Sequence, residues 1–178
     1  MQRERESGNL AHNSLQIRDA RPEELDEVSL LLKDAYREYE KVLPPEAWEY
    51  YLGDIINVRS RLGAARLMVA ESDGRLVGSV TLYLDAAGSS QQGWPGHWAG
   101  VRLLAVHPAY RGRGIGRELM KECVRLGRDK GIKTIGLHTT EFMGTARRMY
   151  ERMGFVRAPE FDFHPRPETV VMAYRLDI

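Results

Sequence analysis

A glycine-rich, basic turn between an apolar segment and a helix constrains this chain more than any other feature. Three of the 17 glycines in its 178 residues lie within five positions, at Gly112, Gly114 and Gly116. The apolar segment 101–106 precedes the turn and ends before Pro108, and a helix-forming segment begins near residue 114. Glycine lets a backbone approach an anion closely, and a helix N-terminus presents N–H groups that have no partner inside the helix. The pattern therefore predicts backbone capture of a phosphate or pyrophosphate.

The spacing around this turn distinguishes three classes of phosphate-binding motif. A nucleotide P-loop requires Gly-Lys followed by Ser or Thr, whereas Gly116 is followed by Arg-Glu. A dinucleotide fingerprint requires G-x-G-x-x-G and an acid ending the next strand, whereas this turn reads G-x-G-x-G and the next strand ends in His138. The third pattern, Arg-x-x-Gly-x-Gly, is satisfied by Arg111, Gly114 and Gly116. Considered alone, the turn also allows a tight strand-to-helix connection with incidental arginines.

Hydrophobic periodicity predicts a mixed α/β fold, with helices on both faces of a central mixed sheet. Antiparallel hairpin material precedes a strand–helix–strand–helix–strand order. We expect a polar tail over residues 1–13, one domain over 14–178, and a loop at 86–96. The expected strands are 15–19, 67–71, 75–84, 98–106, 132–138, 155–157 and 169–176. The expected helices run from 22 to before 44, and over 46–61, 114–130 and 141–153.

Charge and cysteine content exclude several classes of protein. Lys plus Arg is 26 and Asp plus Glu is 25, so the net charge of +1 supplies no global field for nucleic acid or an acidic membrane. No apolar run approaches the roughly 20 residues of a membrane helix. The single Cys123 excludes an internal disulfide and a cysteine-built zinc site, and its helical spacing with Leu119 and Leu126 predicts burial. We expect a cytoplasmic protein with no metal, nucleic-acid or membrane partner, and leave a homodimer open.

Two motifs together resemble one known family. The Arg111-x-x-Gly114-x-Gly116 turn, preceded by Leu-Ala-Val-His-Pro at 104–108, resembles the acetyl-CoA signature of the GNAT superfamily of N-acetyltransferases. Residues 146–155 are similar to that family's second motif, and the order of elements from residue 15 onward agrees with it. The resemblance implies a bulged central strand that splays from a parallel neighbour. It also implies that the arm of acetyl-CoA, as co-substrate, lies in the gap between these strands.

The resemblance assigns roles to individual residues. Leu104 and Val106 would contact the acetyl group and pantetheine through their backbones, and the turn would hold the pyrophosphate. Tyr150 would lie beside the thioester sulfur as general acid, since a phenol can donate to a departing thiolate. The alternative for Tyr150 is a core tyrosine with a satisfied hydroxyl. The implied cofactor-binding residues are Leu104, Ala105, Val106, Arg111, Gly112, Arg113, Gly114, Ile115, Gly116 and Arg117.

The sequence departs from the family pattern at two positions. Met143 stands where relatives often have an asparagine that contacts the cofactor arm. Gly100 stands where many relatives place a glutamate on the acceptor side, so no carboxylate base carries over from the resemblance. The candidates for that role are His97, His138, Glu141 and Asp162.

The function predicted from these features is transfer of an acetyl group from acetyl-CoA to a primary amine, by direct attack in a ternary complex. The alternative is a non-catalytic acyl-CoA-binding or sensing module. Aromatic and acidic side chains suggest that a cationic amine is received by cation–π and charge attraction, while core packing of the same aromatics stays open. The acceptor is left open among a small amine, an amino acid, an antibiotic and a protein amine. The residues concerned are Tyr36, Tyr39, Trp48, Tyr50, Tyr51, Trp94, Trp98, Glu38, Glu40, Glu46 and Glu49.

Overall fold

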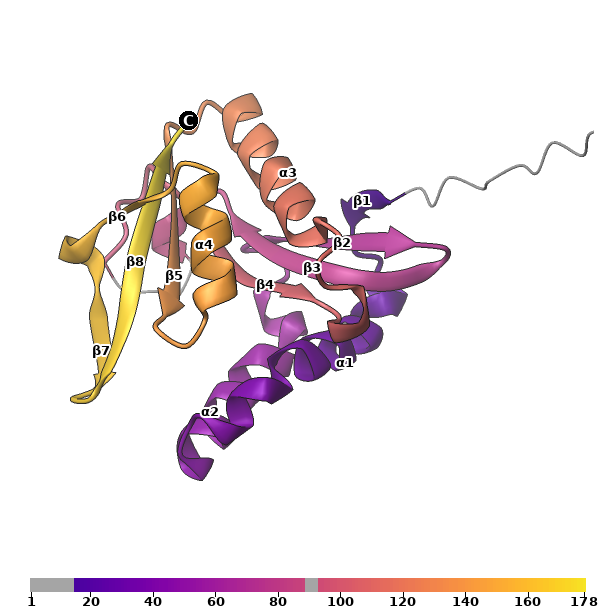
Figure 1. The fold of residues 1–178 in the computed structure, drawn as a ribbon. Coiled ribbons are helices and arrows are strands. Elements are labelled where there is room, and N and C mark those ends of the chain that lie inside the picture. The colour runs from indigo at the N-terminus through magenta and orange to yellow at the C-terminus, as the bar shows by residue number, and fades with distance from the viewer. Residues whose placement is uncertain (1–14, 89–92) are drawn as a thin grey trace, which may run out of the picture.

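The computed structural model describes residues 15–88 and 93–178, and these form a mixed sheet of eight strands with helices on both faces (Figure 1). The strand order is β1-β2-β3-β4-β5-β8-β6, with β7 pairing on β8, and β4–β5 is the parallel pair. The predicted mixed α/β fold is thereby confirmed. The strands are β1 Gln16–Asp19, β2 Arg66–Ser72, β3 Arg75–Tyr83, β4 Ala99–Val106, β5 Thr134–Thr140, β6 Val156–Arg157, β7 Phe163–Arg166 and β8 Thr169–Asp177.

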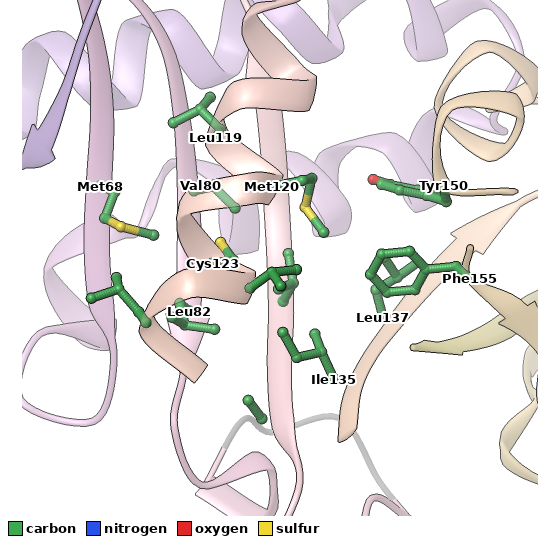
Figure 2. Close-up of a cluster of buried hydrophobic side chains, with 14 of the residues drawn as sticks. Met68, Val80, Leu82, Leu119, Met120, Cys123, Ile135, Leu137, Tyr150 and Phe155 are labelled. Carbon is green, nitrogen blue, oxygen red and sulfur yellow. The ribbon is translucent and has the colours of Figure 1, made fainter. Parts of the chain in front are cut away.

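Four α-helices cover the two faces of the sheet. In β2, Met68 and Ala70 belong to the core on the α3 side, whereas Leu67 and Val69 belong to the core on the side of α1 and α2. Strict alternation of side chains along a strand produces these two cores from one segment. Figure 2 shows the α3 side, where Cys123 is fully buried as expected. The helices are α1 Leu25–Tyr36, α2 Pro45–Ile56, α3 Ile115–Asp129 and α4 Gly144–Arg152.

A bulge in β4 reverses the faces to which its side chains point. Ser79 pairs with Ala105 and Thr81 with Arg102, so two steps along β3 match three along β4. The extra residue coincides with Leu103, whose φ of 52° is unusual for a bulky side chain. As a result Val101 packs on the α3 side, while Leu103 packs on the α1 side.

Beyond this bulge β4 and β5 separate. Their parallel register comprises Ala99–Ile135, Gly100–Gly136 and Val101–Leu137, and no later pair joins them within the described residues. β5 instead continues its antiparallel pairing with β8 as far as Thr140. The sheet therefore opens at the carboxyl ends of its two central strands, as the family resemblance implies.

Several boundaries differ from those expected. The helix α4 begins at Gly144 rather than at 141, because the backbone first makes a turn in which the Met143 N–H donates to the Thr140 carbonyl. The strand β7 was not predicted, since it is short and contains Pro165, which cannot donate to a ladder. The predicted tail 1–13, and residues 89–92 of the predicted loop, lie outside the described residues. Short 3-10 turns occur at Pro22–Glu24, Arg37–Lys41, Val58–Arg61, Ala86–Gly88, Pro108–Tyr110 and Pro159–Phe161.

Candidate functional site

The separation of β4 from β5 opens a cleft of about 1600 Å³. We call one side the glycine-turn wall, which comprises residues 104–106, 111, 112, 114–117 and the cleft-facing residues of α4. We call the other side the tyrosine wall, which comprises Tyr36, Tyr39, Tyr51, Asp54 and Arg102. Side chains of β5 and β7 complete the lining. Of the implied cofactor-binding residues, all except Arg113 line this cleft, and so does Tyr150.

The exposed edge of β4 presents backbone groups to the cleft. The His107 N–H donates to the Val77 carbonyl at 2.9 Å, so the odd-numbered residues after the bulge face β3. Backbone groups alternate sides along a strand, and the N–H groups of Leu104 and Val106 therefore face the gap that β5 has left. Their carbonyls lie on the same side, where Leu104 accepts from the Tyr36 hydroxyl at 3.2 Å. The Val106 carbonyl accepts from the Arg111 Nε at 3.4 Å. The edge therefore offers the N–H groups of Leu104 and Val106 to an extended ligand.

The glycine turn leads directly into the N-terminus of α3. Gly112 and Gly114 have φ of 78° and 79°, a conformation that side chains disfavour, so their conformational freedom is required. The first bond inside the helix is from the Glu118 N–H to the Gly114 carbonyl. The N–H groups of residues 115–117 therefore lack helical partners, and no side chain among the described residues caps them. They form a positive backbone cradle on the cleft.

The arginines around this cradle have different surroundings. Arg111 turns toward the end of α1, where its guanidinium donates to the Ala35 carbonyl at 2.7 Å, and it pairs at 2.8 Å with Glu38 of the following 3-10 turn. Arg113 lies over the Tyr110 ring, 5.0 Å from its centroid. Arg117 lines the cleft from the first turn of α3. Sequence reasoning missed the further cleft arginines of α4, which are Arg148 and Arg152.

Tyr150 of α4 lies at the junction of the core and the cleft. The residue is 6% exposed, and its ring packs against Phe155 with ring centroids 5.8 Å apart (Figure 2). Burial raises the pKa of its hydroxyl, and the nearby Tyr39 adds to the effect. No hydrogen-bond partner for this hydroxyl occurs among the described residues, contrary to a core tyrosine with a satisfied hydroxyl. The side chain is therefore a neutral phenol with a proton to donate.

The tyrosine wall is an aromatic cluster. The Tyr36 ring lies 5.7 Å from Tyr39 and 6.0 Å from Tyr51, and Tyr39 lies 5.2 Å from Phe142. Burial raises the pKa of Tyr39 to about 12, so these hydroxyls also stay neutral. The structure brings only part of the expected acceptor set here. Tyr50 and Glu38 also line the cleft, whereas the residues outside its lining are Trp48, Trp94, Trp98, Glu40, Glu46 and Glu49.

Two charged residues of this wall escaped sequence reasoning. Asp54 near the end of α2 pairs with Arg102 of β4 at 2.9 Å and with Arg61 at 3.5 Å. No local pattern marks Asp54, because its partners are supplied by other elements. The signal that the sequence offered for Arg102 was the alternation of side chains along β4. This alternation places the polar Arg102 on the face of the sheet opposite to Val101.

The four candidate bases are scattered. His138 lines the cleft from β5, whereas His97 is exposed and lies outside the lining. Asp162 pairs with Arg157 at 2.7 Å and accepts from the Ala173 N–H, and Glu141 does not line the cleft. The structure therefore leaves His138 as the sole one of these candidates that faces the cleft.

The ring of His138 is held in one tautomer. Its Nε2 lies 2.9 Å from the Phe161 carbonyl, which can only accept, so Nε2 carries the hydrogen. Its Nδ1 is buried with no partner among the described residues. Burial lowers the pKa of this imidazole, opposed by the Phe161 carbonyl and Asp162. His138 is therefore neutral near pH 7.

Over residues 15–88 and 93–178, no group of three or more His, Cys, Asp or Glu side chains is arranged to hold a metal ion. In the same part of the chain no helix is both long enough and apolar enough to cross a bilayer.

Comparisons with known proteins agree with this geometry. The sequence model of the acetyltransferase (GNAT) family matches residues 25–155. A mycothiol acetyltransferase of Cellulomonas flavigena is 33% identical over 105 residues, which span 58% of this chain and only 30% of that protein. A glucosamine 6-phosphate N-acetyltransferase of Trypanosoma brucei brucei is 29% identical over 105 residues, which span 58% of this chain and 67% of that protein.

Among solved structures, the PaiA N-acetyltransferase of Thermoplasma acidophilum in complex with coenzyme A has a similar fold. It superposes with a TM-score of 0.67 at 19% identity, covering 92% of this chain and 99% of that chain. At this identity the likeness concerns the fold alone.

Proposed function

Because this chain belongs to the acetyltransferase (GNAT) family, as its motifs predicted, we propose that it transfers an acetyl group from acetyl-CoA to a primary amine. The amine attacks directly in a ternary complex. The observation that carries the proposal is the opened edge of β4, where the N–H groups of Leu104 and Val106 face a cleft that begins at the glycine turn. A small-molecule acceptor is supported by the relative named for glucosamine 6-phosphate.

The pantetheine arm of acetyl-CoA would take the place that β5 vacates. Its two amide groups can pair with an exposed strand edge as a neighbouring strand does. The N–H of Leu104 would then donate to the acetyl carbonyl, and the N–H of Val106 to a pantetheine carbonyl. Stabilising the oxygen as it becomes negative is the principal way in which such a donor accelerates acyl transfer.

The pyrophosphate would lie on the N-terminus of α3. The N–H groups of residues 115–117 and the dipole of a helix that extends over Ile115–Asp129 both favour an anion at this point. Arg117 adds charge from the same turn, and Arg148 and Arg152 add charge from α4. Arg111 contributes differently, since its contacts hold the turn against α1.

Tyr150 completes the reaction in this proposal. The amine nitrogen forms a bond to the thioester carbon, and the carbon–sulfur bond then breaks with its electron pair on sulfur. The Tyr150 hydroxyl donates its proton to that thiolate, and the phenolate that is left regains a proton from water, which balances the proton that the attacking amine releases. The raised pKa of Tyr150 keeps the proton in place until the thiolate forms, and the same burial would favour a neutral thiol over a thiolate.

The proton of the attacking amine leaves to water. Gly100 supplies no carboxylate, and the Nδ1 lone pair of His138 is buried in a ring held by the Phe161 carbonyl. The reaction therefore depends on amine that is already neutral, and its rate rises with pH until the amine is fully deprotonated.

The experiment that tests the proposal measures binding and turnover on the same preparation. Acetyl-CoA should raise the melting temperature, since a ligand that binds the folded state stabilises it by mass action. A panel of primary amines should then release CoA thiol only in the presence of an acceptor, with the acetylated amine identified by mass spectrometry. Binding without release for any amine would support the non-catalytic acyl-CoA-binding module instead. Absence of binding would overturn both functions.

A further inference from the structure

The edge of β4 that β5 vacates is also contacted by a tyrosine of α1. The Tyr36 hydroxyl donates to the Leu104 carbonyl at 3.2 Å, from 68 positions earlier in the chain. From this contact we infer that Tyr36 is a positioning residue, which holds the Leu104 N–H in the direction that acetyl transfer requires. The inference rests on the proposed function, because that function assigns the Leu104 N–H to the acetyl carbonyl.

The bulge leaves the backbone around Leu104 in need of support. Leu103 has a φ of 52°, which is strained for a leucine, and such a conformation persists only where its surroundings hold it in place. On one side, β3 holds the strand by pairing with Ala105. On the other side, the pairing with β5 ends at Val101 within the described part of the chain. The peptide units around Leu104 therefore lack the second strand that would fix them.

Tyr36 takes the place of that second strand. It is the last residue of α1 and lies four positions after Leu32, on the buried stripe of the helix. The residue is 8% exposed, and its ring packs edge to face on Tyr39 and Tyr51. Burial raises the pKa of its hydroxyl, so the group is a neutral phenol with a hydrogen to donate. A rigidly packed ring therefore supplies a hydrogen bond of the kind that a neighbouring strand would give.

The end of α1 is itself tied to this part of β4. Arg111 donates to the Ala35 carbonyl at 2.7 Å and, through Nε, to the Val106 carbonyl at 3.4 Å. Leu103 and Tyr36 belong to the same buried cluster on the α1 side of the sheet. The helix end, and with it the ring of Tyr36, therefore keeps its position relative to the strand.

The consequence for catalysis follows from the geometry of the backbone. The carbonyl and the N–H of Leu104 lie in two peptide planes that meet at its Cα, so a bond that holds the carbonyl also restrains the N–H. A preorganised donor aimed at the developing oxyanion is worth about 10²–10³ in rate, and a misplacement of about 1 Å can forfeit much of this gain. Tyr36 thus acts through Leu104 on the transition state, with little effect on the binding of acetyl-CoA.

The first test is Tyr36→Phe, which removes the hydroxyl and keeps the ring against Tyr39 and Tyr51. Acetyl transfer in a single turnover should slow by about three- to thirtyfold, which is less than the loss of a whole donor. The factor should be the same for every amine that is acetylated, and the Kd of acetyl-CoA should change by less than about twofold. A hydroxyl that binds the acceptor would instead raise the KM of some amines more than others, and that result would overturn the inference.

A spectroscopic measurement reports on the Leu104 N–H without any acceptor. A hydrogen bond polarises the thioester carbonyl and lowers its stretching frequency, which infrared spectra of acetyl-CoA with an isotope label at that carbonyl can follow. The band of the wild-type complex should lie below that of free acetyl-CoA. In Tyr36→Phe it should move back toward the free position and broaden, because the peptide is no longer held in one direction. An unchanged band would overturn the inference even if turnover falls.

Tyr174→Phe is the matched control. Tyr174 is a buried tyrosine outside the cleft lining, and its hydroxyl donates to Glu151 at 2.9 Å. This variant should lose at least as much thermal stability as Tyr36→Phe, since its hydroxyl bonds a charged carboxylate. It should nevertheless keep the rate and the carbonyl band of the wild type. If Tyr36→Phe fails to fold, or if Tyr174→Phe slows acetyl transfer equally, the role of Tyr36 is structural and the inference is overturned.

The outcomes separate this inference from the proposed function. If the wild type binds no acetyl-CoA, or binds it and acetylates no amine, the proposed function fails and the inference fails with it. If the wild type acetylates an amine and Tyr36→Phe keeps both the rate and the band, the inference alone fails.

Discussion

The two walls of the cleft are built from different parts of the chain in different ways. The glycine-turn wall consists largely of backbone groups from one stretch of sequence, within residues 104–117, together with cleft-facing residues of α4. The tyrosine wall consists of side chains from α1, α2 and β4, joined by contacts such as the Arg102–Asp54 pair across 48 positions of sequence. Backbone groups do not depend on the identity of the side chains, so the glycine-turn wall suits a cofactor that does not vary. Side chains can be replaced, so the tyrosine wall can change with the acceptor.

This contrast has a direct consequence for mutagenesis. Removing a side chain cannot remove a backbone donor, so truncations on the glycine-turn wall should have modest effects and added atoms should have large ones. The reverse is expected on the tyrosine wall, where the binding groups are themselves side chains. Tyr150 is the exception on the glycine-turn wall, because its proposed role depends on one oxygen atom.

The largest effect is therefore expected at that exception. Tyr150→Phe removes the hydroxyl and keeps the ring against Phe155. Turnover should fall by about ten- to a thousandfold, since general acid catalysis is typically worth 10²–10⁴ and water can replace part of it. Acetyl-CoA affinity should stay nearly constant because the benefit arises in the transition state. Steady-state rates and calorimetry on one preparation measure both, and a fully active variant would exclude Tyr150 from the mechanism.

An added methyl group should have the next largest effect. A Cβ at Gly116 would lie 3.5 Å from Met149 and Val106, an ordinary contact distance, so Gly116→Ala should fold and gain about 0.5–1 kcal/mol of stability. The methyl would nonetheless project toward the gap and hinder approach of acetyl-CoA. Loss of one charge-assisted bond would weaken binding by roughly ten- to a hundredfold.

Gly53→Ala is the control for that substitution. Gly53 lies inside α2, outside the cleft lining, and its Cβ would have no neighbour within 4 Å. The variant should gain similar stability in a thermal melt and bind acetyl-CoA as the wild type does. If Gly116→Ala also binds normally, close approach of the cofactor at Gly116 is refuted.

A smaller effect should separate two arginines of the turn. Arg117→Ala should weaken CoA by about two- to tenfold, for a net loss of roughly 0.5–1.5 kcal/mol, and leave pantetheine fragments without the pyrophosphate unaffected. Arg111→Ala should instead lower the melting temperature, since it removes the contacts with Ala35 and Glu38. Any loss of affinity in Arg111→Ala should then be the same for CoA and for the pantetheine fragments without the pyrophosphate. Calorimetry that shows a pyrophosphate-specific loss for Arg111→Ala would contradict this division.

The smallest effect concerns His138 and pH. Burial lowers the pKa of His138 in the folded protein, so the unfolded chain takes up this proton first as pH falls below about 6.5. Neutral His138 contributes fully to the free energy of unfolding above that pH. This contribution is lost as pH falls through the lower pKa that His138 has in the folded protein. His138→Gln should remove this part of the pH dependence in denaturant titrations, whereas the exposed His97→Gln should not.

The same variant tests the route of the amine proton. If that proton leaves to water, His138→Gln retains a rate that rises toward alkaline pH. A wild-type rate that levels off near pH 7, with that step absent in His138→Gln, would instead make His138 the base.

Local sequence determined the glycine-turn wall and much of the fold. Positive φ at Gly112 and Gly114, the unpartnered N–H groups at the start of α3 and the burial of Cys123 all follow from neighbouring residues or from one helical period. The family followed from the same motifs. Backbone conformation is a local property, so its signals lie next to the groups that they position.

Tertiary structure alone decided the tyrosine wall and the directions of several side chains outside it. It turned Arg111 toward Ala35, placed the Tyr36 hydroxyl on the Leu104 carbonyl 68 positions away, and left His97 outside the cleft. It also joined Asp54 to Arg102 and Arg61. The direction of a side chain depends on where the bulge in β4 reverses its faces and on which helices pack against them. These packing relations join segments far apart in the chain, and no pattern within either segment records them.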